Sequence, residues 1–241
     1  SENAYNPVFA QSLGINPDKL IYVAPETLED CFNVMEQTIK DIRDMDPDTP
    51  IVIAYDSIAV SPSKAEYEAD NYDGNNMQGA VRAKATGACL RKINPLLRKF
   101  KVGLVVINQI RNKVGVMYGD PTTMAAGGNS LEYYLGVNLK TISNKTSDLL
   151  KDDNKKIIGI KGTVRNKKNK VSVPFKEVPF KLIYDEGLDP YEGLLDCLME
   201  DGQVTRSGAW YSWGELKFQR KDLESFATDE KFGELRKFLG I

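Results

Sequence analysis

The chain has 241 residues, of which 41% are hydrophobic and 27% charged, and its net charge is −2. This composition is typical of a globular protein with one large or two smaller domains. A nucleic-acid role would need basic residues concentrated locally, because the chain as a whole is not basic. The sequence contains no histidine, which excludes Ser-His-Asp and Cys-His catalysis and any zinc site with histidine ligands.

Cysteine usage and the first residues indicate the compartment. The three cysteines (Cys31, Cys89 and Cys197) are odd in number and form neither a disulfide framework nor a CxxC pattern. No apolar run approaches the roughly 20 residues that a membrane helix needs. Residues 1–5 lack the basic start and apolar core of a signal peptide. We therefore expect a cytoplasmic protein.

The first half of the chain predicts alternating strands and helices. Leu20 to Val23 is expected to be a short strand. A helix opened by Thr27 follows, and its apolar residues recur at spacings of four and three (Leu28, Phe32, Met35, Ile39 and Ile42). A turn over 46–50 precedes a buried strand that ends at Asp56. A helix is then expected over 80–100, kinked or broken near Pro95, and it leads to a strand over 103–108.

The second half begins with a long segment, Ile110 to Gly128, which we expect to be a functional loop. Further strands are predicted at Val137 to Ile142, Ile157 to Val164 and Phe180 to Tyr184. Composition shifts near Glu186, and a helix over 191–200, an aromatic segment and a last helix ending at Leu239 follow. We expect two domains, residues 1–185 and residues 186–241, in an α/β protein with a small α+β second domain. Trp210, Tyr211 and Trp213 could stack on bases, but core packing of the small domain is favoured.

Two strand ends carry polar residues that could act on a ligand. Asp56 ends a buried strand, where a carboxylate can hold Mg²⁺ or simply begin a turn. Asn108 and Gln109 end the next predicted strand, and Arg111 and Lys113 follow directly. Ligands bind at the carboxyl ends of strands in open α/β sheets. An amide there that leads into a basic loop could make that loop respond to the ligand, although a capping amide and solvated loop charges would give the same pattern.

Three separate stretches closely resemble the RecA recombinase family. They are residues 56–66 (Asp-Ser-Ile-Ala-Val-Ser-Pro-Ser-Lys-Ala-Glu), residues 107–119 (Ile-Asn-Gln-Ile-Arg-Asn-Lys-Val-Gly-Val-Met-Tyr-Gly) and residues 161–175, a basic run followed by Val-Ser-Val-Pro-Phe. They occur in the order of the family, and the resemblance covers essentially the whole chain. It implies a RecA-like P-loop ATPase core with a small carboxyl-terminal domain.

The resemblance implies an ATP and Mg²⁺ site. Glu2 matches the glutamate that activates the attacking water, Asp56 matches the metal-binding strand end, and Ser57 beside it matches the nucleotide site. Gln109 matches the γ-phosphate sensor. Lys168 and Lys170 match two lysines that reach the neighbouring subunit's ATP. Asn6, Phe9 and Tyr184 match positions near the nucleotide, although the family more often has aspartate and tyrosine at the first two.

The resemblance also implies a DNA-binding surface. Arg111 and Lys113 match the basic start of the second DNA-binding loop, where they would pair with phosphates. Val114 and Met117 could insert between bases. The exit of that loop matches Gly127, Gly128 and Asn129, although its approach is less rich in threonine than in the family. The first DNA-binding loop is expected over Glu68 to Gly79, and either Arg82 or Lys84 could be the basic residue entering the next helix.

The phosphate-loop pattern GxxxxGK(S/T) does not occur in the 241 residues. We therefore expect an amino-terminally incomplete chain, truncated before the phosphate loop, that binds ATP poorly by itself. The complete protein is expected to form ATP-dependent homo-oligomeric helical filaments on single-stranded DNA and to exchange strands with double-stranded DNA, without a membrane partner. The alternatives are another RecA-fold ATPase, such as a motor or repair accessory, and a non-enzymatic DNA-binding or regulatory fragment.

Overall fold

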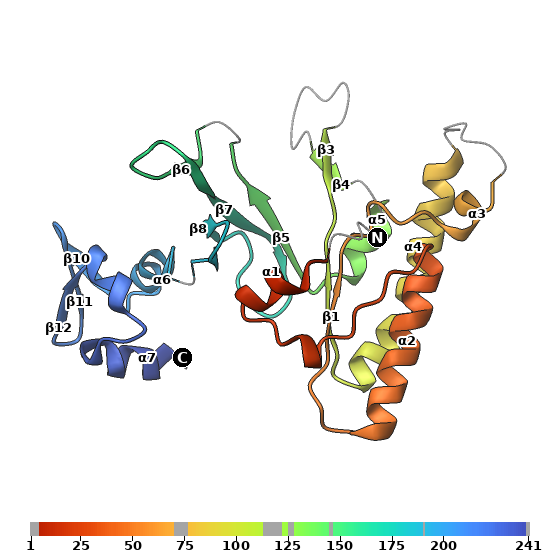
Figure 1. The fold of residues 1–241 in the computed structure, drawn as a ribbon, viewed down its shortest axis with the longest axis horizontal. Coiled ribbons are helices and arrows are strands. Elements are labelled where there is room, and N and C mark those ends of the chain that lie inside the picture. The colour runs from red at the N-terminus through yellow and green to blue at the C-terminus, as the bar shows by residue number, and fades with distance from the viewer. Residues whose placement is uncertain are drawn as a thin grey trace. The chain divides into compact units, whose positions relative to one another are not determined.

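The structure is a computed structural model, and it describes residues 5–69, 77–112, 122–124, 128–144, 147–189 and 191–239. The chain forms two compact units, one of residues 1–10 and 15–135 and the other of residues 11–14 and 136–241. Each unit mixes helices with strands (Figure 1). The domain boundary expected near residue 186 stays a prediction.

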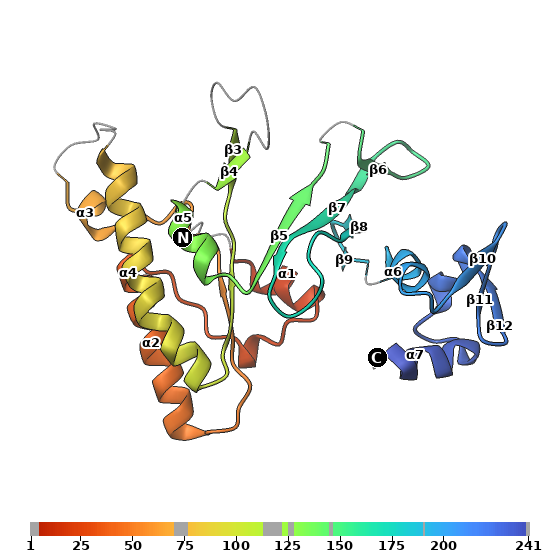
Figure 2. The same cartoon turned by 180° about the vertical axis from the view of Figure 1, so that it is seen from behind.

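The first unit is built around two long helices. Thr27 caps α2 (Leu28–Met45) by accepting a hydrogen bond from the Asp30 amide, and the predicted apolar face is confirmed by the burial of Leu28, Phe32, Met35 and Ile39. Helix α4 (Met77–Lys99) continues through Pro95, so it is not broken there. Figures 1 and 2 show α2 and α4 side by side. Buried side chains of both helices form the core of this unit together with Tyr55 and Ile58.

The remaining elements of the first unit are short. The strands are β1 (Val52–Tyr55), β2 (Gly103–Val106), β3 (Ile110–Asn112) and β4 (Thr122–Met124). The helices are a 3₁₀ turn η1 (Pro17–Lys19), α3 (Lys64–Tyr67) and α5 (Gly128–Tyr134), while α1 (Pro7–Ser12) straddles the two units. Strands β1 and β2 are parallel, and β3 and β4 form an antiparallel hairpin.

One predicted strand in this unit is wrong. Leu20 to Val23 is not in a β-ladder with any part of the chain that the structure describes, and Ile21 and Val23 are more than half exposed. A strand requires a neighbouring backbone to satisfy its amides and carbonyls. A short apolar run cannot by itself indicate whether such a neighbour is present.

The second unit contains an antiparallel sheet and a separate small core. The sheet has the order β5 (Val137–Ile142), β7 (Ile157–Asn169), β8 (Glu177–Ile183) and β9 (Gly187–Leu188), and β6 (Leu149–Lys151) also pairs with β7. Strand β5 has the predicted bounds. The predicted strand at Ile157 extends five residues further than expected, and β8 begins earlier than expected.

Residues 191–239 follow the sheet. They form α6 (Leu194–Glu200), a three-stranded sheet of β10 (Thr205–Ser207), β11 (Trp210–Trp213) and β12 (Leu216–Gln219), two 3₁₀ turns η2 (Arg220–Ser225) and η3 (Glu230–Phe232), and α7 (Gly233–Leu239). Phe218, Phe226, Phe232 and Leu235 are fully buried in one core. The aromatic segment packs mainly as predicted, since Tyr211 is buried and Trp213 packs on the core, but Trp210 is half exposed.

Candidate nucleotide-responsive edge and DNA-binding hairpin

The parallel pairing of β1 and β2 brings two polar strand ends together. Tyr55 lies opposite Val106 in the register. Beyond the strands, the Ile107 amide donates to the Tyr55 carbonyl at 3.0 Å, and the Ile58 amide donates to the Ile107 carbonyl at 3.1 Å. Asp56 and the Asn108–Gln109 pair therefore follow neighbouring strands at the same edge, where α/β sheets bind their ligands.

Asp56 and Ser57 differ in exposure at this edge. The Asp56 side chain is exposed, whereas Ser57 is buried, with 2% of its surface accessible. An exposed carboxylate can share a Mg²⁺ ion with phosphate oxygens and water, since Mg²⁺ commonly takes only one or two protein carboxylates. The described residues contain no group of three or more acidic, cysteine or histidine side chains that could hold a metal alone. This edge therefore suits a metal shared with a ligand rather than an all-protein metal cage.

Gln109 leads straight from this edge into a basic hairpin. Its side chain is exposed, and its backbone amide donates to Asn108 Oδ1 at 2.9 Å. The next residue begins β3, which lies beside β4 (Figure 1), and Arg111 is opposite Thr123 in their antiparallel register. The segment Ile110 to Gly128 is thus not simply a loop, because a β-ladder joins its two ends. Arg111 is exposed on that ladder, where a guanidinium can pair with a phosphate.

Several predicted DNA-binding residues lie beyond the ladder. Lys113, Met117 and Gly127 fall outside the described residues, as does Val114. Gly128 and Asn129 are the first two residues of α5, so the predicted exit of the loop coincides with a helix start.

The amino-terminal residues predicted near the nucleotide lie at the start of α1. Glu2 falls outside the described residues. The Asn6 side-chain oxygen accepts hydrogen bonds from the Val8 and Phe9 amides, at 3.0 and 3.1 Å, so it caps the helix. Phe9 is 47% exposed on that helix. The cap gives Asn6 a structural role that its sequence position did not reveal.

Lys168, Lys170 and Tyr184 belong to the second unit. Lys168 is half-buried on β7 and lies opposite Asn138 of β5, and Lys170 directly follows β7, with its amide donating to the Gly136 carbonyl at 2.9 Å. Tyr184 follows β8 and is 46% exposed. Lys168 and Lys170 lie at the end of β7, whereas Tyr184 lies level with its start, where the Tyr184 amide donates to the Ile158 carbonyl at 3.0 Å. Asp56 and Gln109 lie in the other unit.

Comparisons with known proteins bear on the family of the chain. The model of the RecA N-terminal domain matches residues 1–189. The chain belongs to the RecA family. It is 34% identical to the protein RecA of Thioalkalivibrio sulfidiphilus over 223 residues, which cover 92% of this chain and 61% of that protein. It is 33% identical to the protein RecA of Clostridioides difficile over 231 residues, covering 95% and 62%, and 36% identical to that of Bacillus thuringiensis over 215 residues, covering 89% and 59%.

Membership of the RecA family agrees with the mixed helix and sheet architecture, and the chain has an α/β RecA-like fold. The chain spans about three fifths of the length of the curated RecA relatives that it matches. In the described part of the chain, every helix is too short or too polar to cross a membrane.

The RecA resemblance left open whether Arg82 or Lys84 enters the helix after the first DNA-binding loop, and the structure distinguishes their surroundings. Arg82 pairs with Glu66 of α3 at 2.8 Å, whereas Lys84 is exposed. Residues 63–66 (Ser-Lys-Ala-Glu) match a helix-capping pattern, Ser-x-x-Glu, which could have revealed α3. The ion pair to Arg82 had no such sequence signal, since it joins residues 16 positions apart.

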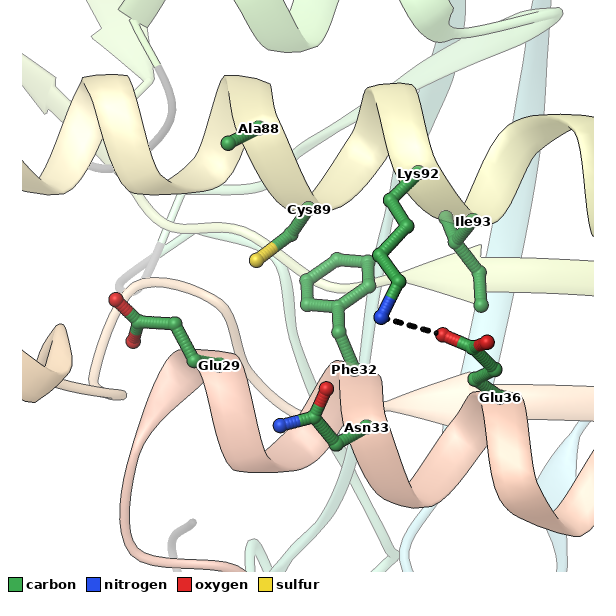
Figure 3. Close-up of a pocket in the computed structure, with 8 residues that line it drawn as sticks. All are labelled: Glu29, Phe32, Asn33, Glu36, Ala88, Cys89, Lys92 and Ile93. Atoms are coloured by element: carbon green, nitrogen blue, oxygen red, sulfur yellow. Dashed lines mark ion pairs between the residues drawn. The ribbon is translucent and has the colours of Figure 1, made fainter.

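A small pocket of about 320 Å³ lies between α2 and α4 of this RecA-family chain (Figure 3). Phe32 and Ile93 provide apolar lining. The Glu36 carboxylate forms ion pairs with Lys92 Nζ at 2.9 Å and with Lys40 Nζ at 2.7 Å. Burial raises the pKa of the Cys89 thiol to about 11, so the thiol stays protonated at neutral pH and is a poor nucleophile. The lining includes none of the predicted site residues, and we assign no function to this pocket.

Proposed function

We propose that this chain acts in homologous recombination and DNA repair as a RecA-type protein. It assembles on single-stranded DNA as an ATP-dependent helical filament and pairs that strand with a homologous duplex. The observation that carries the proposal is the edge where Asp56 and Gln109 follow two parallel strands, with the basic hairpin beginning at the very next residue. Family membership supports the same reading.

The nucleotide side of the proposal rests on groups that fit phosphates and a metal. Asp56 is the residue that would hold Mg²⁺, and its exposed carboxylate fits that ion, while Ser57 beside it belongs to the nucleotide site. When bound, Mg²⁺ supplies positive charge against the phosphate oxygens. Gln109 donates its amide to the γ-phosphate, and Glu2 orients the attacking water. Asn6, Phe9 and Tyr184 flank the nucleotide, with the Asn6 oxygen already engaged as a helix cap.

Lys168 and Lys170 act on the ATP of a neighbouring subunit in this proposal. Two ammonium groups beside a transferring phosphoryl group neutralise charge that develops in the transition state, as an arginine finger does elsewhere. Head-to-tail contacts between identical chains can propagate such an arrangement into a filament. Hydrolysis then depends on assembly, because one chain completes the site of the next.

The DNA-binding part of the proposal follows from the direct connection of Gln109 to the hairpin that carries Arg111. Loss of the γ-phosphate removes the hydrogen bond to Gln109, and Gln109 is joined directly to β3. A displacement of Gln109 therefore passes to Arg111, which contacts the DNA backbone together with Lys113. Met117, Gly127, Gly128 and Asn129 complete the contact surface. Base pairing between strands supplies sequence recognition, since the protein contacts mainly phosphates.

The test measures DNA-stimulated ATP hydrolysis and strand exchange. The 241-residue chain is compared with a chimera that carries, ahead of Ser1, a segment with the phosphate-loop pattern GxxxxGK(S/T), because phosphate-loop amides provide most of the grip on ATP. We expect DNA-stimulated hydrolysis in the chimera that is lost in Gln109→Ala and Asp56→Ala. Single-stranded DNA binding without hydrolysis or strand exchange in either protein would instead support a non-enzymatic DNA-binding role.

A further inference from the structure

Arg82, near the start of α4, is held by an ion pair whose two partners belong to different elements. Its Nε donates to both Glu66 carboxylate oxygens, at 3.2 and 3.1 Å, and Nη2 donates to Oε1 at 2.8 Å. Its Nη1 donates to the Ala59 carbonyl at 3.3 Å. The side chains of Arg82 and Glu66 are only 27% and 10% exposed. A forked, charge-assisted pair of this kind fixes geometry more strongly than an exposed ion pair.

Glu66 is also bound on its other side. Its Oε2 accepts hydrogen bonds from the Ser63 amide and hydroxyl, both at 2.7 Å, which closes the cap of α3. Burial acts to raise the pKa of Glu66, but the hydrogen bonds from Arg82 and Ser63 outweigh it and leave the pKa below its ordinary value. Glu66 therefore stays ionised at neutral pH. Buried Thr86 donates to the Arg82 carbonyl at 2.9 Å and anchors the same turn of α4.

The Ala59 contact connects this ion pair to the strand edge described above. Ala59 lies three residues after Asp56, in the turn that follows β1. In the same turn, the Ile58 amide donates to the Ile107 carbonyl, two residues before Gln109. The turn is thus bonded on one side to Ile107, the residue after β2, and on the other side to Arg82. Glu66 and Arg82 in turn flank the segment predicted to be the first DNA-binding loop.

We propose that Arg82 is a positioning residue that couples the Asp56 edge to the first DNA-binding loop; this inference rests on the proposed function. Its guanidinium is directed to Glu66 and Ala59, so its role is to fix both ends of the loop relative to the turn after β1. Contact with DNA phosphate at the start of α4 falls to the exposed Lys84 instead. In this proposal, a structural change at the Asp56 edge reaches the first DNA-binding loop through Arg82 and the second DNA-binding loop through Gln109.

Two substitutions separate positioning from direct DNA contact. Arg82→Lys keeps a positive charge, which suffices for a phosphate contact, but it cannot form the fork to Glu66 together with the bond to Ala59. Glu66→Gln removes the negative charge but retains a side chain that can serve at this position of a capping box. Both single variants, the double variant and Arg82→Gln are compared. Lys40→Gln, which removes an exposed ion pair from α2, is the control.

Two measurements are made on each variant of the full chain. Fluorescence anisotropy gives the affinity for a labelled single-stranded dT oligonucleotide at several salt concentrations. Amide hydrogen exchange without DNA gives the protection of residues 57–61 and 64–68. We expect Arg82→Lys and Glu66→Gln each to weaken binding about fivefold, and the double variant to be no weaker, because residues of one network are not additive. The salt slope should be unchanged, and exchange should rise in both segments.

The opposite results would overturn the inference. If Arg82→Lys binds like the wild type while Arg82→Gln lowers the salt slope by about 0.7, then Arg82 contacts a phosphate itself. Unchanged exchange at 57–61 would show that Arg82 does not restrain the turn after β1. If neither the wild-type chain nor the phosphate-loop chimera with ATP binds single-stranded DNA at any salt concentration, the proposed function fails, and the exchange result still decides whether Arg82 couples the turn to α3.

Discussion

Removing the Phe232 side chain should strongly destabilise residues 191–239 and leave the stability of the first unit unchanged. Phe232 is fully buried in η3. Its ring centroid lies 5.2 Å from that of Phe218 and 5.0 Å from that of Phe226. Neither these rings nor the rest of this core includes residues of the first unit. Phe232→Ala therefore opens a cavity in the small core alone.

The expected magnitude is large relative to the stability of the region. A Phe→Ala change in a packed core costs about 3–5 kcal/mol. Domains are stable by about 0.05–0.15 kcal/mol per residue, so a region of about 50 residues has roughly 2.5–7.5 kcal/mol in total. The variant should thus lose most of the stability of this region at 25 °C.

Tryptophan fluorescence provides a probe of this region alone. Both tryptophans of the chain, Trp210 and Trp213, lie in β11. In urea unfolding, Phe232→Ala should strongly lower the midpoint seen by tryptophan fluorescence and leave the far-ultraviolet circular dichroism of α2 and α4 largely unchanged. Ile39→Ala is the matched control, because Ile39 is fully buried in the other core. It should cost about 2–5 kcal/mol and shift only the helical signal.

The reasoning would be refuted if both variants lowered both transitions by the same amount. That result would mean that the two cores unfold as one cooperative unit, and the predicted domain boundary near residue 186 would lose its support.

Three further changes test individual elements. Gly162→Ala should destabilise the β5–β7–β8 sheet by about 2–3 kcal/mol in urea unfolding, because an added Cβ would lie 2.5 Å from the Ile142 carbonyl oxygen and 2.7 Å from the Phe180 ring; Gly136→Ala, where a Cβ meets nothing within 4 Å, should be tolerated. Thr27→Ala should cost about 1 kcal/mol by removing the cap of α2, and equal stability of the Ala and Ser variants would argue against the cap. Hydrogen bonds from Lys40 and Lys92 hold the pKa of Glu36 below its ordinary 4.5. The contribution of Glu36 to the free energy of unfolding is therefore fully present above pH 4.5 and is lost as pH falls through the lower pKa of the folded state. Glu36→Gln should accordingly flatten the loss of stability below about pH 4.5 in urea titrations, and an unchanged acid profile would contradict this.

Regular elements with a buried face were predictable from the sequence. The four- and three-residue spacing from Leu28 to Ile39 marks the face of α2 that enters the core, and continuous apolar runs mark β1 and β2. The helix signal comes from the burial of one face, whereas in β1 only Tyr55 is buried and Val52 is 74% exposed, so the prediction of a buried strand there is wrong. That Asp56 and Gln109 follow neighbouring strands was inferred only from the general behaviour of α/β sheets, and the parallel register of β1 and β2 confirms it.

Features that depend on short elements or distant contacts were not predictable. Strands β3 and β4 have three residues each, too few for an alternating pattern, so the sequence indicated only a loop. Leu20 to Val23 has the composition of a strand but pairs with no neighbouring strand among the described residues. The pairing of Arg82 with Glu66 depends on how α3 meets α4, which no local spacing encodes.

The central claim is that the hairpin after Gln109 binds the backbone of single-stranded DNA. The most direct test is the affinity of the 241-residue chain for a labelled single-stranded dT oligonucleotide, measured across a range of salt concentrations, with Arg111→Gln and Lys99→Gln as variants. We predict that the logarithm of the affinity falls linearly with that of the salt concentration, and that Arg111→Gln alone reduces the slope by about 0.7. No binding by either the 241-residue chain or the phosphate-loop chimera with ATP, or an Arg111→Gln slope equal to that of the wild type, would contradict the account.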